Sequence, residues 1–398
     1  MNLISKVSFD DTAVAFSSKS DAELYKMYLL FKAMNSNTFV KAGGALLNTA
    51  LNLHLPVKFL IKPTIFNHFC GGETIAESER AIKELAAYNI GTILDYSVEG
   101  EGDEKSFDAT RDELLRTIEK AHDNKNIPFS VFKITGLIDI NLLEKVQKKQ
   151  ELSADERAAF ERGRDRVNAI CKRCYERDVR VFIDAEESWI QDTIDNLTYE
   201  MMELYNKEKA NIYNTYQLYR HDRLDVLKRD HELALKGGYH LGAKLVRGAY
   251  MEKERRRAAQ EGYPSPINLT KEATDDLFDT ALHYCVQHID RIAFCNGTHN
   301  EASCYLLMEL MEEHNIAPND PRVYFAQLYG MSDNLSYNLA NAGYNVAKYV
   351  PYGPVVEVMP YLLRRANENT AIAGQSSREF TLIQSEIERR KKAKHKQK

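Results

Sequence analysis

Apolar residues recur along this chain with two alternating periods. Short runs rich in β-branched and aromatic residues, typical of strands, are followed by longer segments whose apolar positions are spaced by three and four, typical of helices. The strand-like runs lie at residues 90–97, 129–135, 179–187, 211–219, 243–250, 291–294, 322–330 and 345–350. The helical segments include 156–177, 190–206, 222–235, 252–260, 271–288 and 333–342. Eight strand-and-helix units over roughly 280 residues suit a closed (β/α)8 barrel of the TIM type, typically about 250 residues, better than a doubly wound sheet.

The segment before the first strand shows a helical period only. Leu24, Tyr28 and Phe31 share one helix face, and the same spacing returns over residues 45–51. The pattern therefore predicts three parts: a helical N-terminal arm over residues 1–88, the (β/α)8 barrel over 89–375, and a C-terminal helix with a basic tail over 376–398.

Composition narrows the class of protein. The chain has 398 residues, of which 44% are apolar and 28% charged, as in a soluble globular protein. Its net charge of -5 argues against nucleic acid as a partner. The start of the chain, residues 1–21, resembles neither a signal peptide nor a transit peptide, so we expect a cytoplasmic address. Residues 389–398 are rich in Lys and Arg and are expected to form either a solvated terminus or a peripheral contact with anionic lipid at the inner face of a membrane.

The sequence lacks the usual signatures of metal and phosphate sites. Cys171 and Cys174 have the CxxC spacing but no second pair follows, so we expect free thiols and no metal. The chain has no glycine-rich phosphate loop. A bound nucleotide would have to be held by scattered groups at the strand ends.

Polar residues interrupt the predicted strands near their carboxyl ends, where barrel enzymes place their chemistry. They are Lys133, Asp184, Gln217, Lys244, Arg247, Thr298, His299 and Tyr349. Lys133 should point into the barrel and so needs a carboxylate, either from Asp184 on the neighbouring strand or from a ligand. A purely structural pair between Lys133 and Asp184 is the alternative.

Two adjacent arginines, Arg364 and Arg365, lie on the amphipathic helix that follows the eighth strand. Such a pair is most often a solvated helix face. At the end of a barrel strand, however, it would suit an anion, and the predicted ring of polar groups is dominated by cations. The pattern predicts a ligand that is anionic or rich in acceptors.

The blocks around these residues resemble proline dehydrogenase, the flavin-dependent barrel enzyme of proline catabolism. The matching blocks are 132–136, 183–186, 216–217, 244–250, 298–300, 327–331, 349–353 and 364–369, in the family's order. The resemblance covers the barrel from its second strand onward, whereas the N-terminal arm matches only loosely.

The resemblance implies FAD across the strand ends and L-proline at the flavin face. Cofactor contacts would come from Ala185, Gln217, Arg247, Gly248, Ala249, Thr298 and His299. Substrate contacts would come from Lys133, Arg364, Arg365, Tyr349, Tyr250, Leu328 and Glu368, and the catalytic residues would be Asp184 and Lys244. A guanidinium fork would then meet the proline carboxylate in bidentate geometry.

The same resemblance implies the reaction. Proline would lose a proton from nitrogen and a hydride from C5 to flavin N5, giving Δ1-pyrroline-5-carboxylate. Electrons would pass to a membrane quinone, which implies peripheral membrane contact. We expect a monofunctional enzyme, since nothing in the sequence resembles an aldehyde dehydrogenase domain.

One departure from the family pattern concerns Lys244, because many bacterial members carry Arg there. A point charge in place of a planar fork changes how the flavin is tuned. Tyr349 matches the family's tyrosine that packs against unsubstituted proline, so the resemblance implies proline and not hydroxyproline as the substrate. Three alternatives stay open: a Schiff-base aldolase that uses Lys133 as nucleophile, a non-catalytic binder of a small carboxylate, and another flavin-dependent amine oxidation.

Overall fold

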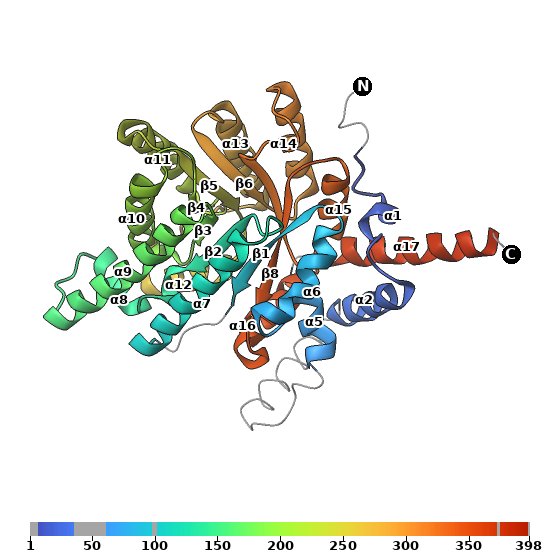
Figure 1. The fold of residues 1–398 in the computed structure, drawn as a ribbon, viewed down its shortest axis with the longest axis horizontal. Coiled ribbons are helices and arrows are strands. Elements are labelled where there is room, and N and C mark those ends of the chain that lie inside the picture. The colour runs from blue at the N-terminus through green and yellow to red at the C-terminus, as the bar shows by residue number, and fades with distance from the viewer. Residues whose placement is uncertain (1–6, 36–60, 98–101, 372–374, 397–398) are drawn as a thin grey trace. The chain divides into compact units, whose positions relative to one another are not determined.

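Eight strands form a closed barrel in this computed structural model, in the order in which they occur along the chain (Figure 1). They are β1 (Ile90–Tyr96), β2 (Phe129–Lys133), β3 (Arg180–Asp184), β4 (Ile212–Gln217), β5 (Leu241–Val246), β6 (Ile292–Gly297), β7 (Val323–Leu328) and β8 (Val346–Tyr352). Successive strands from β1 to β7 pair in parallel. The predicted (β/α)8 barrel is confirmed. The structure describes residues 7–35, 61–97, 102–371 and 375–396, without the side chains of 366–377.

Helices connect the strands in the expected alternation. Within residues 93–326 they are α7 (Glu104–His122), η3 (Ile134–Gly136), α8 (Ile140–Gln147), α9 (Ala154–Glu176), α10 (Ser188–Tyr205), α11 (Arg223–Gly237), α12 (Met251–Glu261), α13 (Lys271–Gln287) and α14 (Glu301–Glu313). Outside that range they are α1 (Thr12–Ala15), α2 (Asp21–Met34), η2 (Lys62–Phe66), α5 (Asn67–Phe69), α6 (Ile75–Ala86), α15 (Asp333–Asn341), α16 (Val355–Ala371) and α17 (Gln375–Lys396). Helix α8 was not predicted, because eight residues show barely two helical turns.

Large aromatic side chains fill the inside of the barrel. The rings of Phe129 and Phe182 stack with centroids 4.2 Å apart, and Tyr213 meets Phe182 edge-on at 5.4 Å. Alternate residues of a strand point to the same side, so these rings share one face of β2, β3 and β4. Gly242 on β5 makes room for them, because a Cβ there would lie 2.7 Å from the Tyr213 ring.

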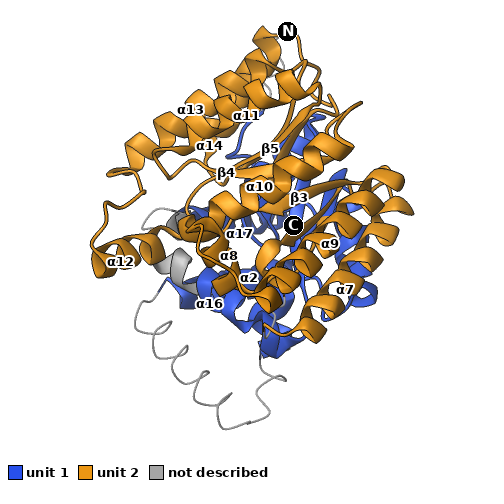
Figure 2. Ribbon diagram, turned by 90° about the vertical axis from the view of Figure 1, so that its left-hand side faces the viewer, with its two compact units in different colours: residues 1–92, 327–398 blue, residues 93–326 orange. Residues whose placement is uncertain are grey.

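The chain divides into two compact units, one of residues 93–326 and one of residues 1–92 with 327–398 (Figure 2). In the second of these units α2 packs against α17 through a buried cluster that includes Phe31 and Ile383. Asp21, near the start of α2, pairs with Arg390 at 2.9 Å and with Lys394 at 2.5 Å. The basic tail is therefore helical through residue 396, and Arg390 and Lys394 of this helix pair with α2. The predicted helix over residues 45–51 lies outside the described residues.

Candidate active site

Three charged side chains meet at the carboxyl ends of β2, β3 and β5. Lys133 and Asp184 are register partners on neighbouring strands, and Nζ of Lys133 lies 3.7 Å from Oδ2 of Asp184. Lys244 donates a hydrogen bond to Oδ1 of the same carboxylate. The side chain of Lys244 is 5% exposed, whereas that of Lys133 is 35% exposed. Asp184 thus neutralises a buried ammonium group and also holds a more accessible one. The predicted pairing of Lys133 with Asp184 is confirmed.

A second carboxylate, which the sequence reading missed, belongs to this cluster. Asp95 near the end of β1 is buried, and its Oδ1 lies 3.8 Å from Nζ of Lys133. Its other oxygen accepts a hydrogen bond from Ser97 at 2.9 Å. The rule that selected Asp184, a polar residue interrupting an apolar strand near its end, applies equally to Asp95 and could have found it. We call Asp95, Lys133, Asp184 and Lys244 the strand-end charge cluster.

The floor under this cluster is aromatic. Nζ of Lys244 lies 5.2 Å from the centroid of the Phe182 ring. The ring face attracts a cation, and the Lys244 side chain above it is 5% exposed. The interaction of Lys244 with Asp184 is therefore stronger than it would be on an open surface.

Glu186 joins the ends of β2 and β3. It is buried and accepts hydrogen bonds from Thr135, from the backbone N–H at 3.0 Å and from the hydroxyl group. Burial raises the pKa of Glu186 from 4.5 to about 7, although the hydrogen bonds from Thr135 act in the opposite direction. Because Thr135 follows Lys133 by two residues, Glu186 fixes the backbone next to the charge cluster.

Two buried polar atoms near the strand ends suit a large polar cofactor. Oε1 of Gln217 and Nε of Arg247 are buried, and neither has a hydrogen-bond partner among the residues that the structure describes. The first is an acceptor and the second a donor, so a ligand with both an N–H group and an anionic group would satisfy both. FAD carries both groups, and the site fits it.

Arg247 is held in place by the helices behind it. Its guanidinium pairs with Asp275 and donates to the Ser303 hydroxyl at 2.7 Å, and it lies over the Phe278 ring at 3.7 Å. Burial lowers the pKa of Arg247, while Asp275 and Asp279 raise it. A fixed, partly desolvated guanidinium group is a strong hydrogen-bond donor to an anion.

The remaining predicted residues of this unit also follow strand ends. Ala185 comes directly after β3 and is buried. Gly248, Ala249 and Tyr250 connect β5 to α12, and the positive φ of +98° at Gly248 suits glycine. Thr298 and His299 follow β6, and the Thr298 hydroxyl accepts from the N–H of the residue that caps α14.

The unit of residues 1–92 and 327–398 carries the other predicted groups. Leu328 ends β7 and Tyr349 lies on β8. Arg364 and Arg365 lie on α16, where Arg364 is exposed and the Arg365 guanidinium stands 5.3 Å from the Tyr361 ring. Glu368 belongs to α16, but its side chain lies outside the described part of the chain.

A buried brace that sequence reasoning missed holds the end of β7 in this same unit. Lys348 is fully buried, pairs with Asp333 at 2.8 Å and donates to the Met331 carbonyl. Nε2 of His68 lies 2.9 Å from the carbonyl oxygen of Gly330, and burial lowers the pKa of His68 to about 4. Gly330 has φ of +76°, and a Cβ there would lie 2.3 Å from the His68 backbone oxygen, so the segment after Leu328 requires glycine.

A cavity of about 280 Å³ lies elsewhere in the unit of residues 93–326. Its lining includes Gln147 on α8, Asp192 and Tyr199 on α10, and Arg229 on α11. These side chains come from the helices and not from the strand ends. We therefore take the charge cluster, not this cavity, as the candidate active site.

Comparison with known proteins identifies the family. The family model of proline dehydrogenase matches residues 78–378. The chain belongs to the proline dehydrogenase family. A mitochondrial proline dehydrogenase 1 of Dictyostelium discoideum is 34% identical over 426 residues, covering 96% of this chain and 74% of that protein. The human proline dehydrogenase 1 is 44% identical over 252 residues, covering 63% of this chain and 41% of that protein.

Two further matches extend the picture. The carbapenem antibiotics biosynthesis protein CarD of Pectobacterium carotovorum is 34% identical over 328 residues, covering 81% of this chain and 83% of that protein. Among solved structures, proline utilization A (PutA) from Bdellovibrio bacteriovorus, inactivated by N-propargylglycine, superposes with a TM-score of 0.70 at 20% identity. The match covers 90% of this chain and 38% of the PutA chain, and it supports the barrel fold.

The predicted cytoplasmic address is wrong. Proline dehydrogenase relatives from Dictyostelium discoideum, Caenorhabditis elegans, Homo sapiens and Arabidopsis thaliana are all named mitochondrial. The prediction rested on the composition of residues 1–21 alone, which the names of these relatives outweigh. Within the described ranges of the chain, none of the helices has the length and apolar character needed to cross a bilayer.

Proposed function

We propose that this chain catalyses the FAD-dependent oxidation of L-proline to Δ1-pyrroline-5-carboxylate and passes the electrons to a membrane quinone. The observation that carries the proposal is the strand-end charge cluster, in which Asp184 joins an accessible and a buried lysine, in a chain of the proline dehydrogenase family. Peripheral contact with the membrane would bring the site to its acceptor.

The substrate is a small zwitterion, and its carboxylate needs cations. We assign carboxylate binding to Lys133, Arg364 and Arg365, because Lys133 is the accessible ammonium of the cluster and a guanidinium pair binds a carboxylate in bidentate geometry. Tyr250, Leu328 and Tyr349 would shape the pocket for the proline ring. Glu368 would support the arginines.

The cofactor would be held by Ala185, Gln217, the turn from Arg247 to Ala249, Thr298 and His299. Support comes from the buried acceptor on Gln217 and the buried donor on Arg247, which suit the N–H and phosphate groups of FAD. When bound, FAD supplies the acceptor, at N5, for the hydride that leaves C5 of proline.

The chain's own groups orient the reactants. Asp184 holds Lys244 at the strand end, where its ammonium group would lie beside the flavin ring and favour negative charge there. Lys133 would fix the carboxylate so that C5 faces the acceptor. The proton that leaves the proline nitrogen goes to solvent, and the lone pair that remains on nitrogen forms the second bond to C5. The hydride that leaves C5 carries one proton and two electrons, so it accounts for the oxidation.

The proposal is tested with a soluble short-chain quinone as the electron acceptor. The FAD-loaded full chain should convert L-proline to Δ1-pyrroline-5-carboxylate with one quinone reduced for each proline oxidised. Saturable proline binding without product would favour a non-catalytic binder. Irreversible labelling of Lys133 by borohydride in the presence of a carbonyl substrate would favour an aldolase.

A further inference from the structure

The side chain of Gln217, the last residue of β4, has a protein partner at only one end. Its Nε2 donates to the backbone oxygen of Glu186 at 2.6 Å. Its Oε1 is buried, and no described residue donates a hydrogen bond to it. A buried acceptor without a donor is unfavourable unless a ligand supplies the donor.

The orientation of this amide decides what Gln217 offers to a ligand. The two ends of an amide have nearly the same shape, so only the hydrogen-bond partners select one orientation. The backbone oxygen of Glu186 can only accept, so it draws Nε2 towards itself and leaves Oε1 facing the other way. The position of Glu186 therefore decides that the acceptor end of the Gln217 amide, and not its donor end, is offered to a ligand.

Glu186 is in turn fixed from the helix that follows it. Its backbone N–H donates to Oε1 of Gln191 on α10 at 2.7 Å. The other end of that amide, Nε2, donates to Oδ1 of Asp195 at 2.9 Å. Gln191 thus connects Asp195 to the backbone of Glu186 and holds that backbone in position.

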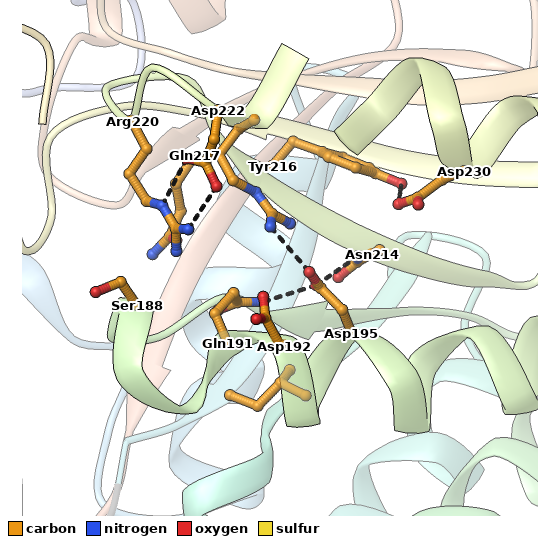
Figure 3. Close-up of polar contacts among 12 residues, drawn as sticks. Ser188, Gln191, Asp192, Asp195, Asn214, Tyr216, Gln217, Arg220, Asp222 and Asp230 are labelled. Carbon is orange, nitrogen blue, oxygen red and sulfur yellow. Dashed lines mark hydrogen bonds and ion pairs between the residues drawn. The ribbon is translucent and has the colours of Figure 1, made fainter. Parts of the chain in front are cut away.

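Asp195 is the fixed end of this chain of hydrogen bonds, and Figure 3 shows the bonds from Gln191 and Asn214 meeting at its carboxylate. Oδ1 also accepts from Nδ2 of Asn214 at 2.9 Å, and Oδ2 accepts from Nη1 of Arg223 at 2.9 Å. Asp195 and Arg223 are both buried. A carboxylate only accepts hydrogen bonds, so it forces Nε2 of Gln191 to face it.

We propose that Asp195 is a positioning residue for the cofactor, which it reaches through Gln191, Glu186 and Gln217. From α10, it holds Gln191 and, through Gln191, the backbone of Glu186 in place, so that the Glu186 oxygen keeps Oε1 of Gln217 positioned to accept from an N–H of the bound ring. The oxidised flavin ring carries one such N–H, at N3. The inference rests on the proposed flavin function and adds to it a residue that does not touch the cofactor.

The test measures FAD affinity, from the quenching of flavin fluorescence as FAD binds to the full chain. In Asp195→Asn the new amide must direct a donor towards either Arg223 or Gln191, so one of the hydrogen bonds that hold Gln191 in place is lost or weakened. We expect the dissociation constant of FAD to rise about tenfold, which is roughly the effect of losing one hydrogen bond. The matched control is Asp230→Asn, which alters another buried carboxylate behind β4, one that accepts from Tyr216 at 2.8 Å (Figure 3).

Two further variants separate positioning from simple loss of stability. Gln191→Met breaks the link but leaves the pair of Asp195 with Arg223 intact, so it should weaken FAD binding by the same factor. The double variant Asp195→Asn/Gln191→Glu moves the carboxylate one step along the chain. It can again accept from both Glu186 and the new amide, and it should restore only part of the affinity, because Nδ2 of Asn214 then faces a donor. The melting temperature of each apoprotein is recorded alongside.

The outcomes are distinct. Weak binding in both single variants, near-normal binding in Asp230→Asn and recovery in the double variant would support the inference. FAD affinities of Asp195→Asn and Gln191→Met equal to that of the unsubstituted chain would overturn it, whatever the melting temperatures. No recovery in the double variant would also overturn it. Failure of the unsubstituted chain to bind FAD would overturn the proposed function and this inference together.

Discussion

Replacing Glu186 by glutamine should change how the stability of the protein depends on pH. Glutamine has the shape of a protonated glutamate and can keep both contacts with Thr135, accepting from its N–H and donating to its hydroxyl. The variant therefore mimics the neutral form of Glu186 at every pH. Any pH-dependent difference in unfolding free energy between the two proteins reports the ionisation of this carboxyl group.

The sign and size follow from the pKa. Burial raises the pKa of Glu186 from 4.5 to about 7, so below pH 4.5 the group is neutral in both folded and unfolded chains. Between these two values only the unfolded chain releases the proton, and the wild-type protein loses stability as the pH rises. Above pH 7 the loss is complete. A pKa displacement of this size corresponds to about 3 kcal/mol.

The assay is urea unfolding of both proteins from pH 4.5 to pH 8. Glu186→Gln should match the wild type at the acid end and be about 3 kcal/mol more stable at the alkaline end. His68 gives an opposite slope, because its lowered pKa of about 4 removes stability as the pH falls below 6.5, but this contribution cancels in the difference. Glu203→Gln, which removes an exposed carboxylate from α10, controls for the change in charge. A difference that stays constant with pH would show that Glu186 ionises as it does in water and would refute the argument.

Three further predictions concern the site. Asp184→Asn removes the carboxylate partner of a buried lysine and should cost about 3 to 5 kcal/mol in urea unfolding, whereas the exposed Asp192→Asn should cost little. A matching small cost for both would contradict the buried pair. Arg364→Met should raise the Michaelis constant for proline, by an amount that corresponds to a loss of about 2 to 5 kcal/mol of binding free energy, without loss of flavin colour. Arg80→Met, at an exposed position, is its control. An unchanged Michaelis constant would remove Arg364 from the carboxylate site. Tyr349→Ser should raise kcat/KM for hydroxyproline relative to proline about tenfold, and an unchanged ratio would rule out contact with the substrate ring.

The barrel and part of its site could be predicted because they depend on local pattern. Strand periodicity is set by burial, and an isolated charge in an apolar strand end needs a partner, which is why Lys133 and Asp184 were paired correctly. Asp95 was missed although the same rule applies to it. The interior arginine of β3, Arg180, was also missed, and it lies 4.4 Å from the Phe129 ring with its charge satisfied by groups distant in sequence.

Polar residues inside helices carried the least information. Asp195 and Gln191 look like ordinary solvent-facing positions of an amphipathic helix, and only the fold shows that they are buried behind β3 and β4. The partners of Asp195 are 4, 19 and 28 residues away along the chain. No periodic pattern links such positions, so a network of this kind becomes visible only in three dimensions.

The central claim is that the strand ends of this barrel hold a flavin against proline. The most direct measurement is the visible absorbance spectrum of the purified, FAD-loaded chain under anaerobic conditions, before and after L-proline is added. The account predicts a yellow protein whose flavin band bleaches on addition of L-proline. A colourless protein that does not take up FAD, or a flavin band that L-proline leaves unchanged, would contradict it.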